Sequence, residues 1–360
     1  MAVKKKMQYY HPRPSSIVAA LYTLRDLNVD VAVLHGPSGC SFKHARLLED
    51  DGIRVLTTSL GDEEFVFGGQ HRLEEVLRFA ESMFHPNRIA VVGTCVSMII
   101  GEDLEAGIQD SGITASAIGV SIHAGFRENI DGVIAALEPA CRAGWISAEE
   151  FDRQKRILAA ANDIEHTRGA ASQSYLAPSR GDLKHEVAEK LLNLARSGAK
   201  GLVIMNAKKE TAYMFADYLC AVHDTCPDAH IIYVANLEQR GLPKVRGDAA
   251  AILQELEGRG IHPECIGALD EYGENGELLG EMIVREQPDF IVFAGVPHAV
   301  SPEVLTGGIV ISSTNGPRQA APLKSQGHTH VIVELDLHPK TIGVHSIVES
   351  EFGAVLRSLQ

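Results

Sequence analysis

Two cysteines, Cys40 and Cys95, stand directly after predicted strands, where α/β chains often place their chemistry. The first closes the glycine-rich turn 35–40, and the second ends the β-branched stretch 88–95. A thiolate at the start of a helix is favoured by the free N–H groups there, and the thiolate is the form that binds metal. A cysteine that only fills a tight strand-to-helix corner would look the same when it is taken alone.

A histidine, His123, follows the predicted strand 115–122 and extends this pattern. The carboxyl ends of parallel strands meet at one edge of a sheet, and ligands bind beyond that edge. We therefore expect Cys40, Cys95 and His123 to share one rim. Two cysteines on the same rim favour a metal site over two structural corners. His298 also lies in a loop after a strand, so both histidines are candidates for proton transfer or axial ligation.

The elements that must position these residues alternate between strands and helices, which is typical of parallel sheets with helices on both faces. The predicted strands span 29–34, 53–59, 88–95, 115–122, 201–206, 230–235, 288–295, 309–312 and 330–335. The predicted helices span 16–27, 41–49, 72–83, 99–109, 130–143, 147–167, 183–197, 210–222 and 248–259, and 62–69 is predicted as a loop. The fold class is therefore α/β, with two to three Rossmann-like units whose parallel sheets are flanked by helices.

Three regions are expected along the chain. Residues 1–146 form an N-terminal α/β domain, 147–198 a helical connector, and 199–360 a C-terminal α/β region that can divide into two small Rossmann-like lobes. The sequence contains no G-x-x-x-x-G-K-[ST] phosphate loop and no convincing G-x-G-x-x-G turn after a strand. If ATP drives this system, another chain must hydrolyse it. No G-x-S-x-G elbow supports a serine hydrolase either.

Composition excludes several classes of function. The formal net charge of −14 argues against nucleic acid as a principal partner, because a phosphate backbone requires a positive surface. No stretch of about 18 apolar residues could span a membrane and no signal peptide opens the chain, so a cytoplasmic location is expected. The six cysteines are spaced too irregularly for a disulfide framework. Cys141, Cys220, Cys226 and Cys265 are expected to be buried as small hydrophobic residues.

Several motifs together resemble the nitrogenase component 1 family, whose members carry H-G-P-x-G-C followed by T-T-x-L and V-F-G-G. The first motif is His-Gly-Pro-Ser-Gly-Cys at 35–40, and 57–69 reads Thr-Thr-Ser-Leu-Gly-Asp-Glu-Glu-Phe-Val-Phe-Gly-Gly. The similarity continues through 91–95, 100–104 and 120–126. These motifs cover about the first 130 residues and are specific in combination, whereas beyond residue 200 the resemblance is general.

The resemblance implies an iron–sulfur cluster that is held between two chains and receives electrons from a nitrogenase reductase-like, ATP-hydrolysing iron–sulfur protein. By position, Cys40 and Cys95 are the cluster ligands. Nitrogenase has a further cysteine between these two, but residues 42–94 of this chain contain none. A 4Fe–4S cluster usually takes four thiolates, so two are missing. A two-fold homodimer would supply them from the same surface of the second copy.

The chain is short for nitrogenase, and no ligands for that enzyme's large metal cofactor can be placed in it. It looks more like the nitrogenase-like tetrapyrrole reductases, and most like those that make the nickel coenzyme of methanogens. This resemblance implies an oxidoreductase that reduces a nickel tetrapyrrole and closes a lactam ring from an acetamide side chain. Arg127 and Lys43 are expected to bind the substrate's carboxylates. His123 and His298 are the expected proton donors.

Three other interpretations remain open at this point. Within the family, the chain could be a scaffold that assembles a cofactor without reducing it, or a reductase of another tetrapyrrole. Outside the family, it could be a Rossmann-like binding protein whose cysteines are structural. Iron content and turnover separate these possibilities.

Overall fold

The computed structural model describes residues 15–40, 42–122, 126, 128–173, 175–335 and 338–360. These residues form two compact units, and the division between them falls between Lys155 and Arg156, inside helix α8 (Ala148–Thr167). The N-terminal unit runs up to Lys155 and includes the short segment 242–244, while the C-terminal unit contains the remainder. Each unit is built on one parallel sheet, which confirms the predicted α/β class. Among the described residues, no helix is both long enough and apolar enough to cross a membrane.

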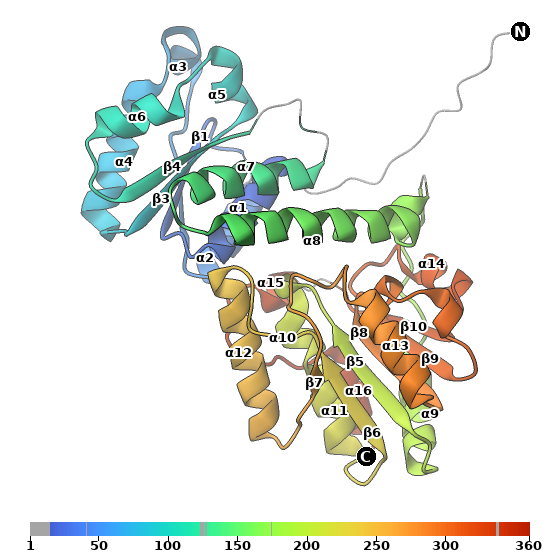
Figure 1. Ribbon diagram of the computed structural model, residues 1–360. Helices are drawn as coiled ribbons and strands as arrows, with labels where there is room; N and C mark the ends of the chain where they lie inside the picture. Colours follow the sequence, from blue (N-terminus) through green and yellow to red (C-terminus); the bar gives the residue numbers. More distant parts are fainter. Residues whose placement is uncertain (1–14, 41, 123–125, 127, 174, 336–337) are drawn as a thin grey trace, which may run out of the picture. The chain divides into compact units, whose positions relative to one another are not determined.

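The N-terminal unit has a four-stranded sheet in the order β2-β1-β3-β4. The central strand β1 buries all five of its residues, as expected for a parallel strand that is covered on both faces. Leu73 and Leu77 of helix α4 pack against Val31 and Val91 on one face of the sheet, and helices α1 and α7 lie on the other (Figure 1). The strands are β1 (Val31–His35), β2 (Arg54–Thr57), β3 (Arg88–Gly93) and β4 (Ser116–Ser121). The helices are α1 (Ser16–Asp26), α2 (Phe42–Asp50), α3 (Asp62–Phe67), α4 (Gln70–Phe84), α5 (Cys95–Ile100), α6 (Leu104–Ser111) and α7 (Asn129–Arg142).

Two sequence predictions are wrong in this unit. Residues 62–69 were expected to form a loop, but they contain α3, whose first turn carries three acidic residues that favour a helix N-terminus. The single helix predicted for 99–109 is divided into α5 and α6. Gly101 adopts a φ of 82°, which ends α5, and the Asp103 side chain accepts the N–H of Ala106 to begin α6.

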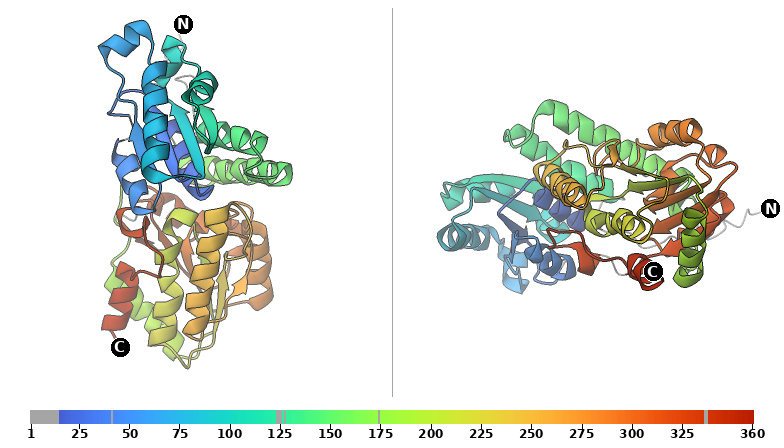
Figure 2. Two further views of the ribbon diagram at one scale, coloured as in Figure 1. Left: turned by 90° about the vertical axis from the view of Figure 1, so that its left-hand side faces the viewer. Right: turned by 90° about the horizontal axis from the view of Figure 1, so that it is seen from below.

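The C-terminal unit has a six-stranded parallel sheet in the order β10-β9-β8-β5-β6-β7. Leu279 and Ile283 of helix α13 pack against Leu202 and Phe293 on one face of this sheet. Helices α11 and α16 cover the other face, and Figure 2 shows the same layers from two further directions. The strands are β5 (Gly201–Asn206), β6 (Ile231–Ala235), β7 (Glu264–Cys265), β8 (Phe290–Gly295), β9 (Ile309–Thr314) and β10 (His330–Val333).

The α-helices of this unit after α8 are α9 (Lys184–Arg196), α10 (Ala212–Phe215), α11 (Asp217–Thr225), α12 (Pro243–Gly258), α13 (Gly276–Glu286), α14 (Ala320–Ser325), α15 (His338–Thr341) and α16 (Glu351–Ser358). Short 3-10 turns are η1 (Ala170–Ser172), η2 (Lys209–Thr211), η3 (Pro297–Ala299) and η4 (Pro302–Val304). Cys220 and Cys226 are buried, as predicted, whereas Cys141 and Cys265 are only half-buried.

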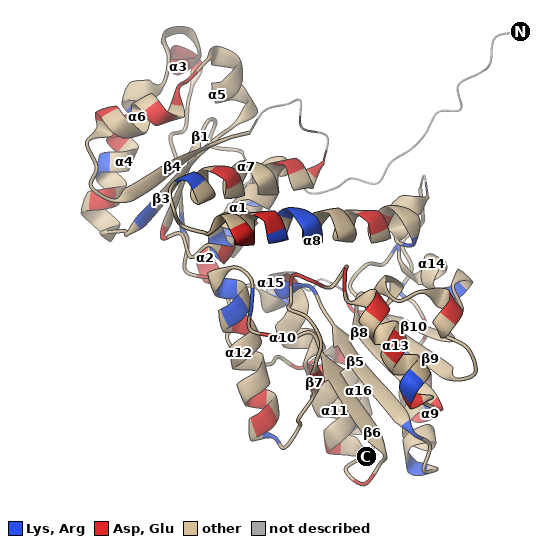
Figure 3. Ribbon diagram, in the orientation of Figure 1, with Lys and Arg blue, Asp and Glu red and all other residues tan. Residues whose placement is uncertain are grey.

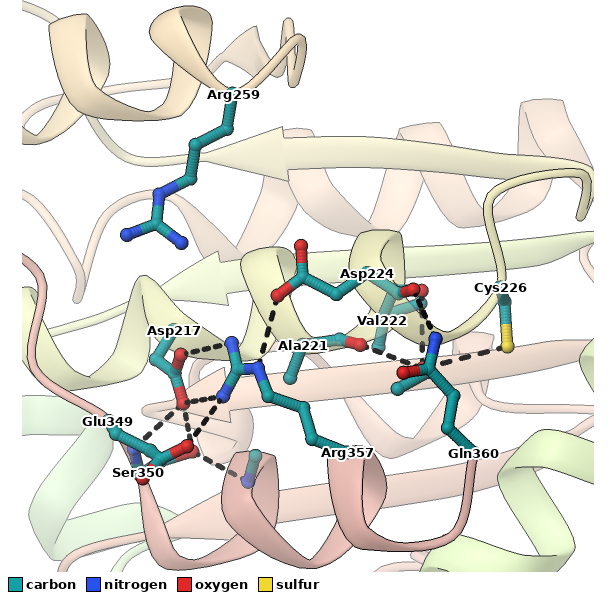
Figure 4. Close-up of polar contacts among 12 residues, drawn as sticks. Asp217, Ala221, Val222, Asp224, Cys226, Arg259, Glu349, Ser350, Arg357 and Gln360 are labelled. Atoms are coloured by element: carbon teal, nitrogen blue, oxygen red, sulfur yellow. Dashed lines mark hydrogen bonds and ion pairs between the residues drawn. The ribbon is translucent and has the colours of Figure 1, made fainter.

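The buried carboxylate of Asp217 joins helix α11 to helix α16 through hydrogen bonds (Figure 4). Asp217 accepts the guanidinium of Arg357 at 2.7 Å, and it also accepts the backbone N–H and the hydroxyl of Ser350, each at 2.7 Å. Arg357 also donates a hydrogen bond to Asp224 at 3.1 Å. The Asp217 side chain is 4% exposed and that of Asp224 is 37% exposed. Asp217 is therefore the partner whose loss leaves buried groups unpaired.

We expect Asp217→Ala to lower the free energy of unfolding by roughly 2–4 kcal/mol, because Arg357 and Ser350 lose their buried acceptor. The matched change Asp224→Ala removes a more exposed partner of the same arginine and should cost about 1 kcal/mol or less. Urea unfolding followed by circular dichroism compares the two variants. Equal losses in the free energy of unfolding for the two variants would contradict the role given to Asp217.

A second stability effect comes from His328, which is buried beside β9. Its Nδ1 lies 2.6 Å from the hydroxyl oxygen of Ser312, and its ring contacts Phe293. Burial, followed by the nearby charge of His298, lowers the pKa of His328 from 6.5 to about 4. As the pH falls, the unfolded chain therefore takes up this proton before the folded chain does, so stability decreases between pH 6.5 and about 4.

The complete lowering of the pKa of His328 corresponds to roughly 3 kcal/mol in the free energy of unfolding. We expect the free energy of unfolding of the wild-type chain to fall more steeply than that of His328→Asn between pH 7 and pH 4.5. Urea titrations at several pH values measure both slopes. Parallel slopes would show that His328 does not contribute to the pH dependence.

Candidate metal centre

Cys40 and Cys95 leave neighbouring strands at the carboxyl edge of the N-terminal sheet. Strands β1 and β3 pair in parallel, with His35 opposite Gly93. Cys40 ends a turn in which its N–H donates to the carbonyl of Pro37 at 3.1 Å, and Cys95 is the first residue of α5. Both thiols are half-buried. The structure thus brings the two cysteines to the same rim of one sheet.

The two thiols are close enough to influence each other. Burial raises the pKa of the Cys40 thiol, and the charge of Cys95 raises it further. Two thiolates in this position repel each other, and a bound cationic centre would relieve that repulsion. Across the described part of the chain, no third histidine, cysteine, aspartate or glutamate completes a metal-binding group with them. The residues present therefore fit one half of a four-thiolate site.

Gly36 allows the two cysteine-bearing loops to approach each other. A Cβ atom at this position would lie 2.2 Å from Oγ1 of Thr94, the residue before Cys95. The N–H of Gly36 donates to the hydroxyl oxygen of Thr58 at 3.0 Å, and the N–H of Thr94 donates to the carbonyl of His35 at 3.2 Å. Glycine is required here by the close packing, because any side chain would push the loops apart.

His35 connects three segments behind the cysteines. Its Nδ1 lies 3.1 Å from the hydroxyl of Thr58, and its Nε2 lies 3.0 Å from Oε2 of Glu102. The other oxygen of Glu102 accepts the N–H of Gly69 at 2.7 Å. Burial lowers the pKa of His35, and the hydrogen bond with Glu102 only partly offsets this effect. A neutral ring that donates from Nε2 to Glu102 and accepts at Nδ1 fits this arrangement.

The role of His35 and Glu102 was not predicted from the sequence. Both residues stand in motifs shared with the nitrogenase component 1 family, which was the one available signal. Their hydrogen bond joins residues 67 positions apart. Together with the hydrogen bond from Gly69 to Glu102, it links the start of the turn 35–40, the loop at Gly69 and the segment after α5.

The other predicted site residues are spread over the chain. Lys43 is exposed on α2, three residues after Cys40. His123 and Arg127 lie outside the described residues. His298 belongs to the C-terminal unit, where it is buried in η3 after β8. The structure therefore brings Cys40 and Cys95 to one rim of the N-terminal sheet and places His298 in the other unit.

An exposed apolar surface accompanies the cysteines. Helix α3 follows β2 and helix α5 follows β3, so both helices lie at the carboxyl edge of the sheet (Figure 1). Val66, Phe67 and Ile99 are 73%, 83% and 78% exposed. Strongly exposed large apolar side chains at one edge of a sheet are typical of an interaction site. We call these three residues, together with Phe65, the apolar rim.

Known proteins match this chain over nearly its whole length. The family model described as "Nitrogenase component 1 type Oxidoreductase" matches residues 15–127, which include both cysteines. Component CfbD of the Ni-sirohydrochlorin a,c-diamide reductive cyclase complex from Methanosarcina acetivorans is 53% identical, over 99% of this chain and 98% of its own length. The same component from Methanothermobacter thermautotrophicus is 48% identical, over 96% and 98%.

The solved structure "Nitrogenase Cp1 at pH 6.5" is 13% identical and matches 91% of this chain and 93% of its own length, with a TM-score of 0.35. The full-length matches confirm the resemblance predicted from the motifs. The chain belongs to the CfbD family of nitrogenase component 1-type oxidoreductases.

Proposed function

We propose that this chain is the catalytic component of an ATP-dependent reductase that reduces and cyclises Ni-sirohydrochlorin a,c-diamide, in the biosynthesis of the nickel tetrapyrrole coenzyme of methanogenesis. The name of its relatives gives that substrate and describes them as one component of a complex. The structural observation that carries the proposal is the pair Cys40 and Cys95 at one rim of the N-terminal sheet. ATP hydrolysis falls to a separate nitrogenase reductase-like subunit, because this sequence contains no phosphate-binding loop.

Cys40 and Cys95 of two copies of the chain would hold one 4Fe–4S cluster with four thiolates. When bound, such a cluster supplies one-electron transfer. The surrounding residues keep the thiols in place. Gly36 allows the loops to approach, and the hydrogen bonds of His35 with Thr58 and Glu102 fix the ends of those loops. A two-fold axis beside the cysteines brings the same residues of the second copy into position.

The apolar rim supports this homodimer. Its side chains lie at the same edge of the sheet as the cysteines, so two copies that share a cluster would cover part of this surface. The first turn of α3 carries Asp62, Glu63 and Glu64 (Figure 3). Acidic side chains beside an apolar surface suit a partner that presents basic residues there, since complementary charge guides docking. The reductase is the partner that we expect to use this turn.

Lys43, which is exposed and near Cys40 in sequence, is proposed to bind a carboxylate of the substrate, together with Arg127. His123 and His298 are proposed as proton donors. We place the complex in the cytoplasm, where thiols remain reduced. The six cysteines of this chain are all free.

Turnover tests the proposal directly. The anaerobically purified chain is mixed with its reductase, MgATP, an electron donor and Ni-sirohydrochlorin a,c-diamide, and the product is followed by absorption and mass spectrometry. We expect a reduced, cyclised product that requires every component. An iron-loaded chain that gives no product would instead support the scaffold, and turnover of a different tetrapyrrole alone would correct the substrate.

A further inference from the structure

A polar cluster in the C-terminal unit is the strongest candidate for a second binding site. The carboxylate of Glu165, on α8, accepts two hydrogen bonds, each at 3.1 Å. Nζ of Lys208 donates to Oε1, and Nε2 of Gln319 donates to Oε2. Nε2 of His298 lies 3.5 Å from Oε1. Lys208, His298 and Gln319 follow strands β5, β8 and β9, so they lie at the carboxyl edge of the six-stranded sheet. That edge is where parallel α/β sheets bind ligands.

The charges within the cluster are well defined. Burial alone would raise the pKa of Glu165, but the ammonium of Lys208 and then His298 outweigh it and hold that pKa well below its usual range. Burial alone would lower the pKa of Lys208, but Tyr272 and Glu165 raise it instead. The carboxylate and the ammonium are therefore both ionised near neutral pH.

Two side chains of this cluster keep polar atoms without a hydrogen bond. Oε1 of Gln319 and Nδ1 of His298 are buried and have no hydrogen-bond partner among the described residues, whereas Nε2 of His298 has only its 3.5 Å contact with Oε1 of Glu165. His298 is 2% exposed and Gln319 is 7% exposed. Buried polar groups are almost always paired, because an unmade hydrogen bond is costly. These atoms therefore indicate a group that the cluster is built to receive.

The Glu165 carboxylate determines what that group must offer. It favours a proton on Nε2 of His298, which leaves Nδ1 as an acceptor. It also accepts the NH₂ of Gln319, which leaves Oε1 as an acceptor. Each acceptor needs a hydrogen-bond donor, and the NH₂ of a primary carboxamide offers two hydrogens on one atom. A carboxylate offers no hydrogen and would meet the negative charge of Glu165.

We propose that His298 and Gln319 form a carboxamide-binding subsite, which selects an amide side chain of the tetrapyrrole and rejects the corresponding carboxylate. This inference rests on the proposed function, because the substrate named for the relatives is a diamide. It gives His298 a binding contact in addition to any transfer of a proton.

The test compares two ligands that differ only in these groups. Ni-sirohydrochlorin a,c-diamide and its diacid counterpart, Ni-sirohydrochlorin, are titrated into the anaerobic full chain, and binding is followed by absorption. We expect the wild-type chain to prefer the diamide at least tenfold. Gln319→Met, which keeps the volume but removes the acceptor, should lower affinity for the diamide about tenfold and leave that for the diacid within about twofold. Gln173→Met, at an exposed position of the same unit, is the matched control and should keep the preference.

His298→Phe is the second variant and should lose the same preference, which protects the test if Gln319→Met does not fold. Preserved discrimination in both folded variants would overturn the subsite, since water alone would then satisfy the unpaired atoms. Equal binding of the two ligands by the wild-type chain would also overturn it, while the proposed function would stand. If neither tetrapyrrole binds to the wild-type chain, the proposed function fails and the subsite fails with it.

Discussion

Replacement of Cys40 or Cys95 by serine is expected to abolish iron binding and turnover while the fold is retained. Each substitution removes two of the four thiolates at once, because both copies in the dimer carry it. A serine hydroxyl is a far poorer ligand than a thiolate for an iron–sulfur cluster. The measurements are iron per chain, visible absorption and turnover on anaerobically purified protein, with circular dichroism to verify folding.

Cys141→Ser is the matched control, since Cys141 is also free and half-buried in the N-terminal unit but lies on α7. It should retain the iron content and the turnover of the wild-type chain. Full iron occupancy in Cys40→Ser or Cys95→Ser would rule out the assigned ligands. Equal iron loss in Cys141→Ser would show that the effect is not specific to the rim.

Substitution of Gly36 by alanine is expected to have the second largest effect. The added Cβ would lie 2.2, 2.6 and 2.9 Å from Oγ1, Cγ2 and Cβ of Thr94, so rotation of that side chain cannot relieve the overlap. The loops must separate, which moves Cys40 away from Cys95. We expect a loss of roughly 1–3 kcal/mol in the free energy of unfolding, together with a large loss of iron. Urea unfolding of the iron-free chain and iron analysis measure the two effects.

Gly39→Ala provides a control in the same turn, because a Cβ at Gly39 meets nothing within 4 Å. It should bind iron as the wild-type chain does. In a Thr94→Ala background, Gly36→Ala should lower the free energy of unfolding by less, since Oγ1 and Cγ2 of Thr94 are no longer present to overlap. An unchanged cost in that background would mean that Gly36 acts through something other than Thr94.

The sequence predicts the sheet elements well because buried parallel strands are short apolar runs that end at turns. Strand β5 was predicted at its observed bounds, and the ends of β1 and β3 placed both cysteines on one rim. Helix α3 was missed for a physical reason. Its apolar residues, such as Val66 and Phe67, point to solvent, so the pattern of a helix that packs on a core is absent.

Contacts between distant segments could not be predicted in the same way. His35 meets Glu102 only after β1 and β3 pair, and no local pattern marks that hydrogen bond. The grouping of Glu165, His298 and Gln319 likewise depends on the order of strands in the six-stranded sheet. Nothing in the sequence alone shows that β5, β8 and β9 are adjacent there.

The central claim is that two copies of this chain share one cluster through Cys40 and Cys95. Native mass spectrometry of the anaerobically purified protein tests it most directly. We predict a dimer whose mass exceeds that of two chains by a single cluster of four iron and four sulfide atoms, and which carries no cluster after Cys95→Ser. A monomer that holds a complete cluster, or a folded dimer free of iron, would contradict the account.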